Sequence, residues 1–165
     1  MTKKLRISTV SELLAFRAIQ EKVILHYKSE ENREMAFLAC WAILEKFIKV
    51  IATEYRRCLL EKSLRDWLAY IDSGINKPTK KPETVLDNVN LPKKSEFISS
   101  LNNYGFDGEG VWIIMDSEGK HRRRRNELAH TGRKFTDIST YNLLYADVEK
   151  MVHQIFSQVK LIHSD

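Results

Sequence analysis

Residues 35–44 read Met-Ala-Phe-Leu-Ala-Cys-Trp-Ala-Ile-Leu and give the clearest structural signal in the chain. A helix over this stretch is apolar on every side, and such a helix is buried. We therefore expect it to form the central helix of a bundle. The whole chain of 165 residues has only 6 Gly and 3 Pro, and this scarcity of breakers favours long helices over a turn-rich β fold.

Apolar spacing predicts further helices on both sides of this stretch. One begins near residue 10, where Thr9 and Glu12 have capping-box spacing, and ends near Tyr27. The central helix is predicted to start after an N-cap at Ser29 and to run from about residue 30 into the fifties. The other predicted helical segments are 60–72, a short helix after Pro92, 111–115, a stretch through 127–129 capped by Gly132, and 138–160.

These segments together predict one all-α domain over residues 1–165, a bundle of about five helices. Residues 75–91 contain two prolines, several lysines and few apolar groups, and are predicted to form a long exposed connection. No stretch approaches the roughly 20 apolar residues of a membrane span, and the start lacks the apolar run of a signal peptide. We expect a cytoplasmic protein that does not contact the membrane.

The composition and motifs of the chain exclude several kinds of structural and catalytic site. Cys40 and Cys58 lie inside helical patterns, far from any second Cys at ligand spacing, which disfavours both a disulfide scaffold and a zinc site. The sequence has no Gly-rich phosphate loop, no Gly-x-Ser-x-Gly and no His-Glu-x-x-His. An enzyme with this sequence is therefore expected to work with a few side chains, without a metal ion or cofactor.

Positive charge is concentrated in one place. The formal net charge is +5, which favours a polyanionic partner such as RNA. One unbroken run consists of Lys120, His121, Arg122, Arg123, Arg124 and Arg125. We expect Lys120, Arg122, Arg123 and Arg124 to contact RNA phosphates, and His121 either to join them or to be simply exposed.

The run leads into a group of side chains suited to RNA cleavage. Asn126 and His130 are four residues apart and share a helix face, whereas Arg125 lies about 140° from His130 on an ideal helix. RNA carries its own nucleophile, the 2′-hydroxyl. Histidine titrates near neutral pH and suits the proton transfers, and arginine suits phosphate binding.

The segment Arg125-Asn126-Glu127-Leu128-Ala129-His130 resembles the Arg-x(4–6)-His motif of HEPN-domain ribonucleases. Leu101–Gly105 and the Ala-His-x-Gly ending are similar to small stand-alone bacterial members of that family. The resemblance implies a homodimer with a composite cleft, and a metal-independent RNA endonuclease of a toxin–antitoxin or antiviral system. It also implies that Arg125 binds the scissile phosphate, His130 transfers protons and Asn126 orients or assists.

Several alternatives stay open at this level. Arg123, Arg124 and Arg125 all satisfy the motif spacing, and Arg125 is preferred because Asn126 follows it. Glu45, on an otherwise apolar stripe, is either a supporting carboxylate that pairs with a motif Arg or His, or a surface charge. The alternative function is a non-catalytic HEPN-like module that binds nucleic acid, nucleotide or a partner protein, such as an antitoxin or regulator, through residues 120–125.

Overall fold

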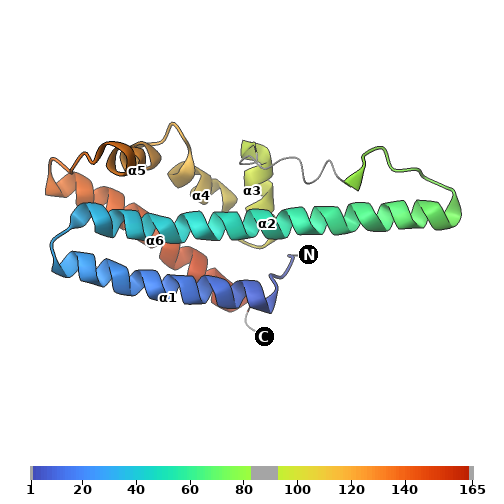
Figure 1. Cartoon of the computed structure of the whole chain (residues 1–165), viewed down its shortest axis with the longest axis horizontal. Helices are drawn as coiled ribbons and strands as arrows, with labels where there is room; N and C mark the ends of the chain where they lie inside the picture. The colour runs from blue at the N-terminus through green and yellow to red at the C-terminus, as the bar shows by residue number, and fades with distance from the viewer. Residues whose placement is uncertain (1, 83–92, 164–165) are drawn as a thin grey trace.

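The computed structural model describes residues 2–82 and 93–163, and within these ranges it contains six helices and no strand (Figure 1). The fold is an all-α helical bundle, as the sequence predicts. The helices are α1 (Ile7–Ser29), α2 (Arg33–Ser73), α3 (Lys94–Asn103), α4 (Gly108–Met115), α5 (Lys120–Thr131) and α6 (Ile138–His163).

The helix α2 is the centre of the bundle and contacts α1, α3, α5 and α6. Figure 1 shows α1 lying along one side of its first half and α3, α4 and α5 along the other, while α6 crosses behind. The prediction of a buried central helix is confirmed, because Phe37, Trp41 and Leu44 are at most 1% exposed. The Nε1 atom of Trp41 is buried there without a hydrogen-bond partner.

The predicted division of this region into two helices was wrong. The structure has one helix of 41 residues, capped at its start by the side chain of Asn32, which accepts a hydrogen bond from Met35 N, and not by Ser29. Residues 33–73 contain no Gly or Pro, so nothing in the backbone ends the helix where the apolar stretch ends. It ends at Gly74, which adopts a left-handed conformation with φ of 69°.

The start of α1 is fixed by a buried carboxylate on α2. The Glu54 side chain is 2% exposed and accepts hydrogen bonds from Thr9 Oγ1 at 3.0 Å and Arg6 Nε at 2.9 Å. Burial alone would raise the pKa of the Glu54 carboxyl, but the bonds from Arg6 and Thr9 and the charges of Arg6 and Arg57 outweigh it and lower that pKa. Thr9 thus anchors the helix, which begins at Ile7, and does not cap it.

The connection after α2 is described as far as residue 82. Its residues are exposed, except for the half-buried Pro78 and Pro82, and Trp67 Nε1 donates a hydrogen bond of 2.9 Å to the carbonyl of Lys80. The remainder of the predicted connection, 83–91, lies outside the described residues. Among the helices that are described, none combines the length and apolar character needed to cross a membrane.

Candidate functional site

The motif residues lie on α5, which is anchored to the bundle by two buried side chains. Leu128 is 6% exposed, and His121 is 3% exposed with its Nε2 2.8 Å from Asp147 Oδ2 on α6. The expectation that His121 is exposed was wrong. His121 and Leu128 are seven residues apart, so both lie on the face of α5 that packs against the bundle.

The arginine of the motif is held by the central helix. Arg125 Nη2 lies 2.9 Å from Glu45 Oε1 on α2, and Arg125 Nη1 donates a hydrogen bond of 3.0 Å to Asn126 Oδ1. All three side chains are half-buried. Glu45 therefore pairs with a motif arginine, which is one of the two readings that the sequence left open. The guanidinium keeps further N–H groups that these two bonds do not use.

The histidine of the motif is open to solvent. His130 is exposed in the last turn of α5, one residue before Thr131 and two before Gly132, whose φ of 65° caps the helix. Asn126 lies one turn earlier on the same face, but its Oδ1 is used by Arg125.

The basic run is distributed around α5 and does not form one patch. Arg122 donates to the carbonyl of Met115 at 3.0 Å, and Arg124 donates to Glu127 Oε2 at 2.7 Å. Both side chains are half-buried. Arg123 is exposed, and Lys120 is exposed 3.8 Å from Asp147. Of the four predicted RNA-contacting residues, two thus carry structural bonds and two extend towards solvent.

Two cations next to His130 were missed in the sequence. Arg133 and Lys134 are exposed immediately after the Gly132 cap. The segment that carries them is held in place because Phe135 N donates to Glu34 Oε1 on α2 at 2.8 Å, and because the Arg124 guanidinium stacks 4.4 Å from the Phe135 ring centroid. The sequence does contain a signal for them, because Arg133 and Lys134 directly follow the predicted helix cap Gly132.

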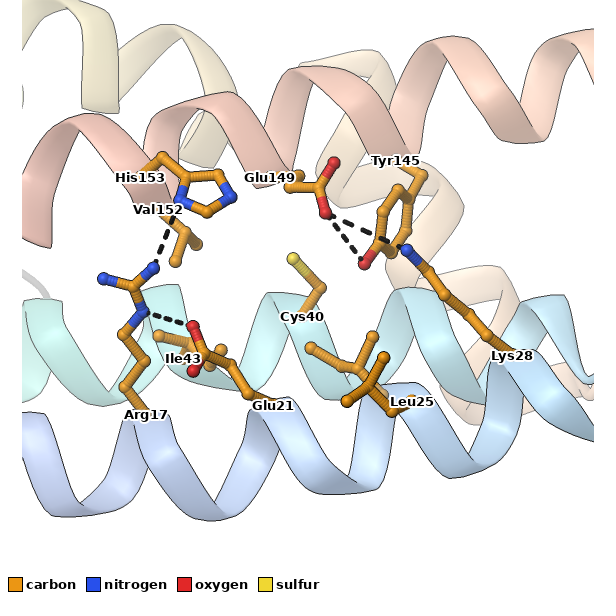
Figure 2. Close-up of a pocket in the computed structure, with 11 residues that line it drawn as sticks. Arg17, Glu21, Leu25, Lys28, Cys40, Ile43, Tyr145, Glu149, Val152 and His153 are labelled. Carbon is orange, nitrogen blue, oxygen red and sulfur yellow. Dashed lines mark hydrogen bonds and ion pairs between the residues drawn. The ribbon is translucent and has the colours of Figure 1, made fainter.

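A separate cavity of about 250 Å³ lies between α1, α2 and α6 (Figure 2). Its apolar lining residues include Leu25, Ile43 and Val152, and none of the described residues of α5 lines it. The charged groups at its two ends pair with each other within the chain. At one end Arg17 bonds Glu21 and His153, and at the other Glu149 contacts Lys28 and Tyr145, as the dashed lines in Figure 2 show.

Cys40 and Tyr145 line this cavity and belong to the core, as does the neighbouring Tyr141. The Cys40 thiol is 2% exposed, and burial raises its pKa to about 12, so it is not a thiolate at neutral pH. Tyr145 and Tyr141 are 6% and 7% exposed, and burial raises both phenol pKa values. Both tyrosines pack in the bundle.

Comparison with protein-family models, with curated proteins and with solved structures finds no match to this chain. Within residues 2–82 and 93–163, no group of three or more His, Cys, Asp or Glu side chains is placed to hold a metal ion. The candidate site is therefore defined by the side chains of α5 and their partners on α2.

Proposed function

We propose that this chain is a metal-independent RNA endonuclease of the HEPN type, with Arg125 and His130 as its catalytic pair. One observation carries the proposal. An exposed imidazole ends the same helix on which a half-buried guanidinium is fixed by a carboxylate of the central helix, at 2.9 Å. A basic group that is oriented by a carboxylate and has spare N–H donors is suited to a phosphate.

The proposed reaction is cleavage by the 2′-hydroxyl of the RNA. Its oxygen attacks the neighbouring phosphorus, the bond from phosphorus to the 5′-oxygen breaks, and the products are a 2′,3′-cyclic phosphate and a 5′-hydroxyl. The proton of the 2′-hydroxyl passes to a neutral imidazole, and the leaving 5′-oxygen takes a proton from an imidazolium. Arg125 binds the non-bridging oxygens, whose charge grows in the transition state.

The two proton transfers call for two groups, and the motif supplies one imidazole, His130. We propose that a second copy of the chain supplies the other, so that the active enzyme is a homodimer with one composite cleft. In this arrangement Asn126 fixes the guanidinium of Arg125, to which it is bonded at 3.0 Å. Glu45 is a positioning residue that acts through Arg125.

The exposed cations around His130 guide RNA to the cleft. Arg123, Arg133 and Lys134 are exposed on α5 and directly after it. We assign them, together with Lys120, to backbone phosphates, and we assign Arg122 and Arg124 mainly to holding α5 and the following segment. Phosphate contacts of this kind give affinity without base preference and weaken as salt rises.

The proposed cellular role is that of a toxin or antiviral effector, restrained by an antitoxin or regulatory protein. Overexpression in bacteria is expected to slow growth, and His130→Ala is expected to relieve the effect. Normal growth with the wild-type chain would count against a constitutively active toxin.

The decisive experiment is incubation of the protein with end-labelled RNA in EDTA. Wild-type protein is expected to cleave, whereas His130→Ala and Arg125→Ala are expected to lose cleavage and to keep their helical content. His26→Ala serves as the matched control, since His26 is also an exposed histidine near a helix C-terminus and is expected to leave cleavage unchanged. Equal cleavage by wild type and His130→Ala, or cleavage only with added metal, would refute the proposal.

The second candidate is a binding module without catalysis, and the exposed Lys120, Arg123, Arg133 and Lys134 favour it. It would bind RNA in EDTA without forming product over hours, and the affinity would fall steeply with salt. His130→Ala would then bind RNA as the wild type does.

A further inference from the structure

The second half of α2, residues 55–73, extends beyond the start of α1 (Figure 1), and none of its residues is buried. Five large apolar side chains on and just after it are exposed, namely Leu59 at 37%, Leu64 at 46%, Leu68 at 59%, Ile71 at 71% and Ile75 at 65%. Spacings of four and three residues place Leu64, Leu68 and Ile71 on one helix face, and Ile75 follows directly after the Gly74 cap. A contiguous exposed apolar stripe of this kind marks a protein interaction surface.

The two flanks of this stripe differ. On one flank Trp67 donates to the Lys80 carbonyl and meets the Tyr70 ring, with centroids 5.9 Å apart, so the connection after α2 covers that side. The opposite flank carries Arg65 and Asp72, both exposed and two helical turns apart. Neither of the two forms an ion pair with another described residue.

We propose that the second half of α2 pairs with the same segment of a second copy of this chain, in antiparallel orientation. In an antiparallel pair related by a twofold axis, each flank faces the same flank of the other copy. Arg65 and Asp72 lie at nearly equal distances on either side of Leu68 in sequence. A twofold axis near Leu68 therefore sets Arg65 of each copy opposite Asp72 of the other.

The apolar stripe is centred within one residue of the same axis. Leu68 meets its own counterpart at the axis, and Leu64 of one copy faces Ile71 of the other. One cation and one anion placed symmetrically about the centre of an apolar stripe make the surface complementary to itself. This property selects a second copy over an unrelated partner, because an unrelated partner gives no reason for the symmetric placement.

This contact is distinct from the proposed catalytic dimer. Figure 1 shows α5 at one end of the molecule and the end of α2 at the other, so the two surfaces can be occupied together. The inference stands without the proposed nuclease activity. A specific interface commonly buries about 800 Å² on each partner, more than a single short helix pair provides, and we therefore expect a dimer that dissociates in the micromolar range.

Sedimentation velocity of the full chain at rising micromolar concentrations tests the proposal by charge exchange. Arg65→Asp alone and Asp72→Arg alone each turn two attractive pairs into two repulsive ones and are expected to weaken dimerisation by about tenfold. An equimolar mixture of the two variants restores both pairs, so it is expected to dimerise as the wild type does. Leu68→Glu is expected to abolish this dimer without loss of helical content.

Lys62→Asp and Asp66→Arg are the matched controls, since these two exposed residues lie on the opposite face of the same helix turns and their reversal is expected to leave dimerisation unchanged. A wild-type chain that stays monomeric would overturn the proposal. So would a dimer that ignores Arg65→Asp and Leu68→Glu, which would form through another surface, and so would a mixture no more dimeric than its two components.

Discussion

The guanidinium of Arg125 and the carboxylate of Glu45 lie 2.9 Å apart and join α5 to the central helix. Glu45 stands one turn beyond the buried Trp41 on α2, so its position is set by the core. The ion pair with Glu45 in turn fixes the position of the Arg125 guanidinium. The direction of the motif arginine therefore depends on the bundle as a whole, and not on α5 alone.

Removing the carboxylate tests this dependence. Glu45→Ala is expected to lower kcat for RNA cleavage by about ten- to a hundredfold, because a catalytic group that is slightly misplaced loses most of its effect. KM is expected to stay constant, since loss of a negative charge does not weaken phosphate binding. Glu45→Gln, which keeps an acceptor for the arginine, is expected to recover part of the rate.

Lys49→Ala, at an exposed position one turn further along α2, is the control and should leave both kinetic constants unchanged. A rise in KM at constant kcat would show that Glu45 does not position Arg125 for catalysis.

The buried Glu54 makes the start of α1 sensitive to pH. Its folded-state pKa is lowered, so its stabilising contribution is complete above the ordinary carboxyl value of 4.5 and is lost as the pH falls through the lower folded-state value. Glu54→Gln is expected to lower the free energy of unfolding at pH 7 by about 1–2 kcal/mol, because the bonds from Arg6 and Thr9 lose a charged acceptor while the arginine partners are partly exposed to solvent. Urea denaturation at pH 7 and at pH 3 measures it.

The loss is expected to be smaller at pH 3 than at pH 7. Glu61→Gln, on the same helix but with an exposed carboxylate, should cost much less at either pH. An equal loss for both variants would contradict the structural role of the buried carboxylate.

The first turn of α6 has a similar acid-sensitive group at the surface. Asp137 accepts hydrogen bonds from Ser139 Oγ at 2.7 Å and from Thr140 N at 2.6 Å, and these bonds lower its pKa to about 2. The contribution is present above the ordinary value of 3.8 and is lost towards pH 2. Asp137→Ala is therefore expected to lower Tm at pH 7, and the difference from wild type should vanish near pH 2.

Thermal melts followed by circular dichroism between pH 7 and pH 2 measure this difference in Tm. Asp66→Ala, at an exposed position on α2, should not change Tm at either pH. If the two aspartate variants behaved alike, Asp137 would not be the helix cap that its hydrogen bonds indicate.

The corner between α3 and α4 depends on the absence of a side chain at Gly108. A Cβ atom there would lie 2.5 Å from the carbonyl oxygen and 2.9 Å from the Cα of Ile98, and both are backbone atoms. Gly108→Ala is expected to lower the free energy of unfolding by about 1–3 kcal/mol through overpacking. Glu109→Ala, the exposed neighbour, provides the comparison in the same urea titration; equal stability of the two variants would mean that the corner tolerates a methyl group.

The sequence predicted the parts of the fold that depend on local pattern. Residues 35–44 marked the buried centre of the bundle, and Gly132 marked the end of α5. The unbroken length of α2 was missed because the apolar pattern weakens after residue 54 while the helix continues without a breaker. The point where the apolar pattern stops shows where α2 leaves the core, but it does not show where the helix ends.

The residues of the candidate site could be named from the sequence, but their contacts could not. Arg125, Asn126 and His130 could be grouped by spacing, but their partners come from other helices. The bond from His121 to Asp147 joins residues 26 apart, and the contact of Phe135 with Glu34 joins residues 101 apart. A run of arginines in the sequence does not indicate which partner each one has, because successive side chains point to different sides of the helix.

The central claim is that the Arg125 and His130 pair cleaves RNA through the 2′-hydroxyl of its substrate. The most direct measurement is the chemistry of the new ends formed in EDTA from an RNA that carries a single 2′-deoxy substitution at the main cleavage site. We predict a 2′,3′-cyclic phosphate and a 5′-hydroxyl from unmodified RNA, no cut at the deoxy position, and no product at all with His130→Ala. Cleavage at the deoxy position, or ends with a 3′-hydroxyl and a 5′-phosphate, would contradict this mechanism.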